Sequence, residues 1–210
     1  ESKEMRMNLI KEELVEVRDK YGDARRSRIE YAGGEMNIED LIADEQVVIT
    51  ISHAGYIKRT PLSEYKTQNR GGVGQKSAGT RDQDFLEHMY VATNHQYMLF
   101  FTQKGKCFWL RVYEIPEGSK QAKGRAIQNL INIENDDKVK AFICTQDLRD
   151  ETYTGNHYIV MCTKQGQVKK TSLEQYSRPR QNGINAITIK EGDELLEAKL
   201  TDGNSKVLIA

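Results

Sequence analysis

One pattern of 19 residues occurs three times in this chain, and it limits the folds that the chain can adopt. The copies are VVITISHAGYIKRTPLSEY (47–65), YMLFFTQKGKCFWLRVYEI (97–115) and YIVMCTKQGQVKKTSLEQY (158–176). Each copy begins with five largely apolar residues and continues with Ser or Thr, two variable residues and a glycine (Gly55, Gly105, Gly166). Because glycine readily adopts the positive φ that tight turns require, each copy predicts a β-hairpin.

The similarity continues beyond each hairpin. A later glycine follows the turn glycine by 19, 19 and 17 residues, at Gly74, Gly124 and Gly183. An acidic turn and another β-like stretch come next, in DQDFLEHMYVAT, NDDKVKAFICTQ and EGDELLEAKLTD. Four short strands per unit, with turn glycines 50 and 61 residues apart, are typical of propeller blades. An ordinary antiparallel sandwich is the alternative fold.

We therefore predict a mainly β chain with an N-terminal helix. Blades are expected near 47–95, 96–156 and 157–204, with a fourth beginning at 205–210. Apolar residues in steps of three and four predict one face of a helix over 1–22, at Met7, Ile10, Leu14, Val17 and Tyr21. Residues 23–46 are expected to form a linker. Since the sequence starts without Met inside the helix and ends in an apolar run, we expect it to be part of a longer protein.

Composition excludes several classes of protein. The chain is 38% hydrophobic and 30% charged, which indicates a soluble globular protein. No apolar run approaches the roughly 20 residues of a membrane helix, and the first stretch is too charged for a signal peptide. The three cysteines and four histidines lack the spacing of a metal or redox site. We expect buried free thiols, as in a reducing cytosol.

The net charge of zero conceals a strong segregation of charge. Residues 1–45 carry a net −5, residues 53–81 a net +5, and 104–125 and 164–180 a net +4 each. Basic residues recur at related places in the three units: Lys58, Arg59, Lys106, Arg111, Lys169 and Lys170 near the turn glycines, and Arg70, Lys123, Arg125, Arg178 and Arg180 near the later ones. Each one alone could be an ordinary solvated side chain. Because blades rotate in space, their recurrence predicts a basic stripe suited to a bent polyanion.

The stretch QNRGGVGQKS (68–77) places three glycines beside positive charge, a composition common where phosphates bind. A nucleotide-binding P-loop needs G-x-x-x-x-G-K-[ST] between a strand and a helix, and a dinucleotide fingerprint needs G-x-G-x-x-G; neither is present. No set of catalytic side chains stands out either. The remaining interpretation is a loop whose bare backbone N–H groups approach a DNA strand, with Arg70 and Lys76 supplying charge.

Residues 45–78 and 100–133 strongly resemble the first and second blades of the C-terminal domain of the DNA gyrase A protein, and 10–29 resembles the end of the coiled-coil helix before it. The resemblance covers essentially the whole chain. It implies a β-pinwheel, a propeller variant with strands exchanged between blades, with about three of a usual six blades present. It also implies that DNA wraps around a basic rim, which lets an ATP-dependent type II topoisomerase introduce negative supercoils.

The family's signature loop, the gyrase A box Q-R-R-G-G-K-G, is matched at Gln68, Arg70, Gly71, Gly72 and Gly74. Asn69 and Val73 stand where the family usually has Arg and Lys. The resemblance therefore implies a loop with its glycines kept and two charges lost. We expect Lys66 and Lys76 to compensate for that loss in part.

The resemblance assigns no catalytic residue and no cofactor to this chain, since the catalytic tyrosine, ATP and magnesium belong to other parts of the holoenzyme. It implies double-stranded DNA, the gyrase B protein and a second gyrase A protein as partners in an A2B2 assembly in the bacterial cytoplasm, associated with the chromosome and not with a membrane. The alternatives are the equivalent domain of topoisomerase IV, whose first blade usually lacks this loop, a protein-interaction propeller and, last, a nucleotide-binding enzyme.

Overall fold

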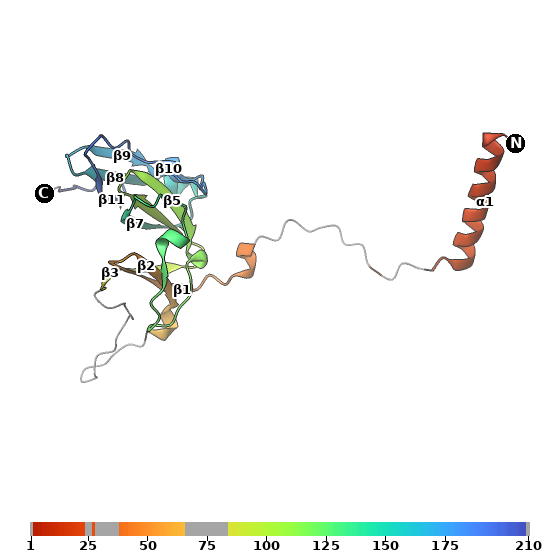
Figure 1. Ribbon diagram of the computed structural model, residues 1–210, viewed down its shortest axis with the longest axis horizontal. Coiled ribbons are helices and arrows are strands. Elements are labelled where there is room, and N and C mark those ends of the chain that lie inside the picture. The colour runs from red at the N-terminus through yellow and green to blue at the C-terminus, as the bar shows by residue number, and fades with distance from the viewer. Residues whose placement is uncertain (1, 24–26, 28–37, 66–83, 209–210) are drawn as a thin grey trace. The chain divides into compact units, whose positions relative to one another are not determined.

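The computed structural model describes residues 2–23, 27, 38–65 and 84–208 (Figure 1). The chain forms two compact units, Glu1–Ile38 and Glu39–Ala210. The first contains α1 (Lys3–Tyr21), whose first turn is capped by Ser2: the Ser2 hydroxyl accepts a hydrogen bond from the Met5 amide at 3.3 Å. The predicted N-terminal helix is thus confirmed. None of the helices in the described ranges is long and apolar enough to span a lipid bilayer.

The second unit contains three antiparallel sheets (Figure 1). The first has the order β3-β1-β2-β6 and consists of β1 (Gln46–Ser52), β2 (Tyr56–Pro61), β3 (Leu86–Thr93) and β6 (Arg125–Ala126). The second has the order β10-β5-β4-β7 and consists of β4 (Tyr97–Thr102), β5 (Lys106–Arg111), β7 (Val139–Thr145) and β10 (Ile184–Asn185). The third has the order β11-β8-β9 and consists of β8 (Tyr158–Thr163), β9 (Val168–Ser172) and β11 (Leu195–Thr201).

Short helices lie before and between these strands. The 3-10 turns are η1 (Ile38–Leu41), η2 (Leu62–Glu64), η3 (Val112–Glu114), η4 (Ile127–Asn129) and η5 (Leu173–Tyr176), and α2 (Glu151–Asn156) precedes the third hairpin. Asp150 caps α2 by accepting hydrogen bonds from the amides of Thr152 and Tyr153. The predicted mainly β fold with a single N-terminal helix is confirmed, with α2 as a short addition.

Each of the first two sheets is completed by a strand from the following repeat. β6 follows the second hairpin in the chain but pairs with β2, where Ile57 faces Arg125. β10 follows the third hairpin but pairs with β5, where Cys107 faces Ile184. This exchange is the arrangement that the resemblance to the pinwheel implied.

The hairpin tips show why each repeat contains a turn glycine and a later aspartate. Gly55, Gly105 and Gly166 have φ values of 80°, 82° and 82°, as the sequence predicted. In each repeat the carboxylate of one aspartate accepts hydrogen bonds from the amide at the hairpin tip and from its own next residue; these aspartates are Asp84, Asp137 and Asp193. The aspartate therefore ties the hairpin tip to the start of the returning strand.

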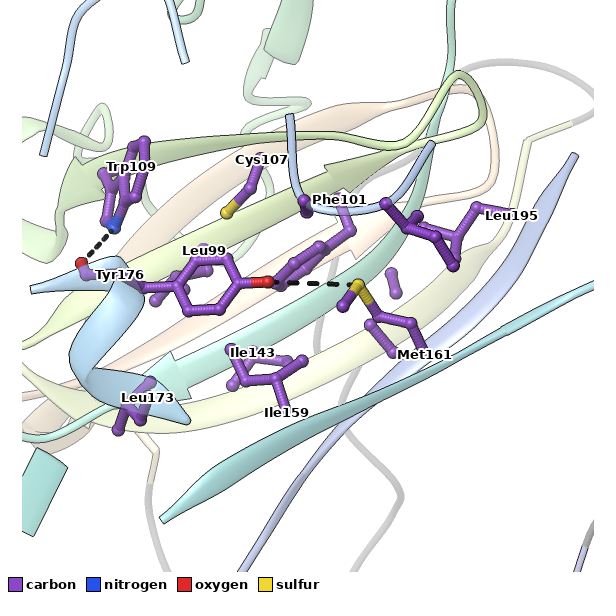
Figure 2. Close-up of a cluster of buried hydrophobic side chains, with 14 of the residues drawn as sticks. Leu99, Phe101, Cys107, Trp109, Ile143, Ile159, Met161, Leu173, Tyr176 and Leu195 are labelled. Atoms are coloured by element: carbon purple, nitrogen blue, oxygen red, sulfur yellow. Dashed lines mark hydrogen bonds between the residues drawn. The ribbon is translucent and has the colours of Figure 1, made fainter. Parts of the chain in front are cut away.

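The core lies between consecutive sheets and has two clusters. β4 is buried on both faces, because Leu99 and Phe101 belong to one cluster and Met98 and Phe100 to the other. Side chains alternate along a strand, so the continuous apolar run of β4 serves both sides. The cluster of Leu99 contains side chains from the second and third sheets and is closed by Tyr176 (Figure 2).

Tyr176 links these two sheets through its polar groups as well as its ring. The indole of Trp109 donates a hydrogen bond to the Tyr176 carbonyl at 3.0 Å, and the Tyr176 hydroxyl lies 4.0 Å from the Met161 sulfur (Figure 2). Its ring meets that of Phe101 edge-on, with centroids 5.8 Å apart. Burial raises the pKa of Tyr176 well above its usual range. The Tyr176 hydroxyl therefore remains protonated and uncharged in the core at physiological pH.

The segment that leads into β6 is held by side chains of β2. The ammonium of Lys58 donates to the carbonyls of Ser119 and Lys120 at 2.8 and 2.7 Å. The Thr60 hydroxyl donates to the Gly118 carbonyl at 2.7 Å. Lys58 is buried, and burial lowers its pKa. These contacts fix the path of the chain before the exchanged strand.

Replacing Gly124 with alanine should destabilise the fold more than replacing Gly55 with alanine. Both glycines have φ near 80°, where a Cβ costs roughly 1–2 kcal/mol. At Gly124 the Cβ would also lie 2.6 Å from the Ile57 carbonyl oxygen, whereas nothing lies within 4 Å at Gly55. Urea denaturation should show a free energy of unfolding lower by at least ~1 kcal/mol in G124A than in G55A. Equal losses would contradict the close crossing.

Lys58→Met should lower the free energy of unfolding by about 1–3 kcal/mol, because two carbonyls lose a charged hydrogen-bond donor. Lys123→Met, at an exposed position, serves as the control and should change stability by at most about 0.5 kcal/mol. Thermal and urea denaturation of both variants measure the difference. A stability of K58M equal to that of the unaltered chain would show that the two hydrogen bonds contribute nothing.

Candidate nucleic-acid interface

The glycine loop predicted from the sequence lies outside the described residues, and so do Lys66 and Lys76. The role of Gln68, Arg70, Gly71, Gly72 and Gly74 therefore stays a prediction. The structure does describe the matching segments of the next two repeats, 118–124 and 177–183, which end at Gly124 and Gly183. These two segments show where the repeat places such a loop.

In the second repeat, Lys123 and Arg125 flank Gly124 at the start of β6, and both side chains are exposed. Gly124 has a φ of 79° and passes directly over the backbone of Ile57. The chain thus crosses the edge of β2 at this point. The two cations stand on either side of the crossing.

The third repeat also crosses a strand edge at a glycine, but both of its cations lie before that glycine. Arg178 and Arg180 are exposed and precede Gly183, whose φ is 68° and whose Cβ would lie 2.8 Å from the Cys107 carbonyl oxygen. The chain crosses the edge of β5 here and then forms β10. In the described part of the chain, no ion pair is made by any of the four crossing cations: Lys123, Arg125, Arg178 and Arg180.

The other predicted rim residues are more engaged with the protein. Lys169 donates to the Ala186 carbonyl at 2.6 Å, and the ammonium of Lys170 lies 4.1 Å from the Tyr158 ring centroid; both remain exposed. Arg59 pairs with Glu117 at 2.8 Å and is only 17% exposed. These side chains can add to a positive surface, but each already makes a contact within the protein that would compete with a phosphate.

Lys106 shares a carboxylate with a neighbouring lysine. Its ammonium lies 2.5 Å from Glu134, which also pairs with Lys104 at 2.9 Å. Hydrogen bonds from both lysines lower the pKa of Glu134 to about 2. The charge of Lys106 is therefore largely balanced within the protein.

Two predicted rim residues lie inside the fold, so neither is an exposed cation like the four at the crossings. Lys58 is buried and holds the segment before β6. Arg111 is also buried: its guanidinium stacks 3.8 Å from the Tyr97 ring centroid, donates to the His95 carbonyl and pairs with Glu39 at 2.9 Å. Counting basic residues at matching positions could not reveal this, because the buried Lys58 occupies the same place in the repeat as the exposed Lys169.

Sequence reasoning missed Glu39 and the ion pairs it makes. Glu39 also pairs with Arg149 at 2.8 Å, so one carboxylate bridges two guanidinium groups. One signal was available. Arg111 stands where the other repeats have Pro61 and Ser172, which marks it as a departure from the repeat.

Neither metal binding nor thiol chemistry finds support in the described residues. They contain no group of three His, Cys, Asp or Glu side chains placed to hold a metal ion. All three cysteines are free thiols. Burial raises the pKa of Cys107, and that of Cys144 to about 11, so both remain protonated and poorly nucleophilic at neutral pH.

Curated relatives are DNA gyrase A proteins. That of Staphylococcus epidermidis is 45% identical over 207 residues, which make up 98% of this chain and 23% of the relative. That of Aeromonas salmonicida is 41% identical over 208 residues, or 99% of this chain and 22% of the relative. The chain thus spans less than a quarter of the length of these two relatives.

Solved structures share the fold. The C-terminal domain of DNA topoisomerase IV matches with a TM-score of 0.63 and 32% identity over 77% of this chain and 47% of that one. The DNA gyrase A C-terminal domain matches with a TM-score of 0.56 and 23% identity over 75% and 48% of the two chains. The family described as DNA gyrase C-terminal domain, beta-propeller, matches residues 46–93, 96–146 and 157–202, which contain the three hairpins and the strands that return to them. With well over half of its residues matched in this way, the chain belongs to the DNA gyrase C-terminal domain, beta-propeller family.

Proposed function

We propose that this chain is the DNA-wrapping part of a gyrase A protein, which lets an ATP-dependent type II topoisomerase introduce negative supercoils. The observation that carries this proposal is the recurrence of two exposed cations, without ion pairs among the described residues, at each strand crossing: Lys123 with Arg125, and Arg178 with Arg180. Family membership supports it. The box residues 68–74 would form the matching point of the first repeat.

Recurrence at successive crossings suits a long polyanion better than a small ligand. A duplex that contacts one crossing can continue to the next, since consecutive repeats are joined there. Contacts of Lys and Arg with phosphates fix the path of DNA without reading its sequence. Each neutralised phosphate releases counterions, so affinity should fall steeply with salt.

The remaining parts of the proposal concern the whole enzyme. We propose double-stranded DNA, the gyrase B protein and a second gyrase A protein as partners, in an A2B2 assembly that acts on the chromosome in the bacterial cytoplasm. The chain itself would supply binding and not catalysis. ATP, magnesium and the tyrosine that attacks DNA would belong to other parts of that assembly.

The corresponding domain of topoisomerase IV is the second candidate, because the solved C-terminal domain of that enzyme is 32% identical to this chain. The Q-x-R-G-G-x-G loop at 68–74 favours gyrase. Ligating relaxed circular DNA in the presence of the complete protein distinguishes the two. Wrapping should change the linking number, whereas binding with an unchanged linking number would contradict the gyrase assignment.

Removing two crossing cations should reduce the salt dependence of DNA binding. The double variant K123Q/R178Q should lower the slope of log Kobs against log salt by roughly two units, one for each phosphate contact. The control K104Q/K164Q also removes two charges, but these lysines are paired with Glu134 and Glu194. Fluorescence anisotropy with a labelled duplex measures both slopes. Equal slopes would favour a protein-interaction propeller whose basic residues only solubilise the surface.

Arg70→Ala should weaken wrapping more than Lys199→Ala. Arg70 lies in the predicted box, whereas the ammonium of Lys199 is paired with Glu197 at 3.6 Å on β11. The change in linking number after ligation measures wrapping for each variant. If the two variants lose the same amount, the box is not where wrapping begins.

A further inference from the structure

A cavity of about 570 Å³ beside the second hairpin contains three arginines. Arg111 and Arg149 line it together with the carboxylate of Glu39, and Arg180 lines it from the third repeat. Tyr97 and Trp109 form part of its aromatic wall. Arg180 is also one of the four crossing cations, so the cavity adjoins the candidate interface.

Glu39 occupies this cavity much as a phosphate would. One of its oxygens lies 2.9 Å from Arg111 Nη2 and 2.8 Å from Arg149 Nη2. The Glu39 side chain is only 19% exposed, and that of Arg111 only 7%. The planar donors of guanidinium groups match carboxylate and phosphate oxygens equally well. An anion can therefore replace Glu39 without rearranging the donors.

The cavity has more positive than negative charge available for pairing, which favours a more strongly charged anion than a carboxylate. Glu114 accepts a hydrogen bond from the Arg111 amide at 2.7 Å, so that carboxylate is engaged with the backbone. Glu39 is then the carboxylate that pairs with both Arg111 and Arg149, while Arg180 makes no ion pair within the described ranges. A DNA phosphate in place of Glu39 would meet the guanidinium groups of Arg111 and Arg149, with Arg180 lining the same cavity. Arg111 needs some anion at all times, because a buried charge without a partner is strongly unfavourable.

Glu39 can leave the cavity while the residues that follow it stay bound to the protein. Further along, the Asn94 amide donates to the Ala43 carbonyl at 2.9 Å, and the His95 amide donates to Asp44 at 3.0 Å. These contacts hold residues 43–44 independently of the ion pairs. Movement of η1 would withdraw Glu39 while these contacts hold the residues that follow, together with His95 Nε2, which lies 2.7 Å from the Ile42 carbonyl.

We propose that the Arg111–Arg149 pair is a phosphate-binding site on the DNA path and that Glu39 is its internal competitor. This inference rests on the proposed function. Binding of DNA at this site displaces Glu39. When Glu39 occupies the site instead, DNA binding is weaker. By linkage, anything that draws the segment before β1 away from the cavity strengthens the grip on DNA. The site thereby couples wrapping to the position of the chain that enters the first repeat.

Glu39→Gln tests the competition, and Asp40→Asn is the matched control. Asp40 is the exposed neighbour of Glu39 and makes no ion pair within the described ranges. E39Q should bind duplex DNA several-fold more tightly at moderate salt and raise the salt slope by roughly one unit or more. D40N should change little. Adding R149Q to E39Q should remove the gain.

Glu39→Asp is a second variant that keeps the charge near Arg111. Its shorter side chain cannot bridge both guanidinium groups, so its gain in DNA affinity should lie between those of the unaltered chain and E39Q. Equal gains in E39Q and D40N would overturn the proposal. So would weaker DNA binding by both Glu39 variants, since Glu39 would then act only as a structural tie.

Inorganic phosphate separates this site from the proposed function. At matched ionic strength, phosphate in place of chloride should raise the Tm of E39Q more than that of the unaltered chain, and R149Q/E39Q should lose this increase. If the unaltered chain binds no DNA but this phosphate effect is present, the proposed function fails and the anion site stands. If phosphate stabilises all variants equally, the anion site is wrong, whatever DNA does.

Discussion

The exchange of strands between repeats is the interaction on which the rest of this structure depends. β6 completes the sheet of β1 and β2, and β10 completes the sheet of β4 and β5. Each exchange brings backbone against backbone at a glycine, and an exposed pair of cations lies near that glycine in sequence at both crossings. The same crossing therefore joins the repeats and places the charges that we propose meet DNA.

Packing follows from the same connection. Because β4 is buried on both faces, the second repeat shares one cluster with the first and another with the third. Tyr176 joins the second and third repeats in this way, because its ring packs in the core and its carbonyl accepts a hydrogen bond from the indole of Trp109 (Figure 2). The shared clusters hold consecutive repeats together, and the crossing cations lie on this joined framework.

Much of the fold could be predicted because it repeats. The turn glycines, the apolar runs and the later glycines each occur three times, because each hairpin turn needs a positive φ and the first strand of each hairpin packs in the core. Individual side chains were harder to predict. The burial of Lys58 depends on the carbonyls of Ser119 and Lys120, and that of Arg111 on the carboxylate of Glu39, all of them distant in sequence. No local pattern contains that information. The loop 68–74 differs from these side chains, because a local sequence pattern does predict it. Its role stays a prediction, since the loop lies outside the described residues.

The exchange also has a consequence for how such a chain is made. β6, which completes the first sheet, begins at Arg125, after the whole second hairpin, and β10 likewise follows the third hairpin. During synthesis on a ribosome, the edge strand of each sheet therefore stays unpaired until the next repeat has emerged. Unpaired edge strands can pair with the wrong partner. In this order of synthesis, each newly made repeat supplies the strand that closes the sheet of the repeat before it. β9 ends the described series with no exchanged strand beside it among the described residues.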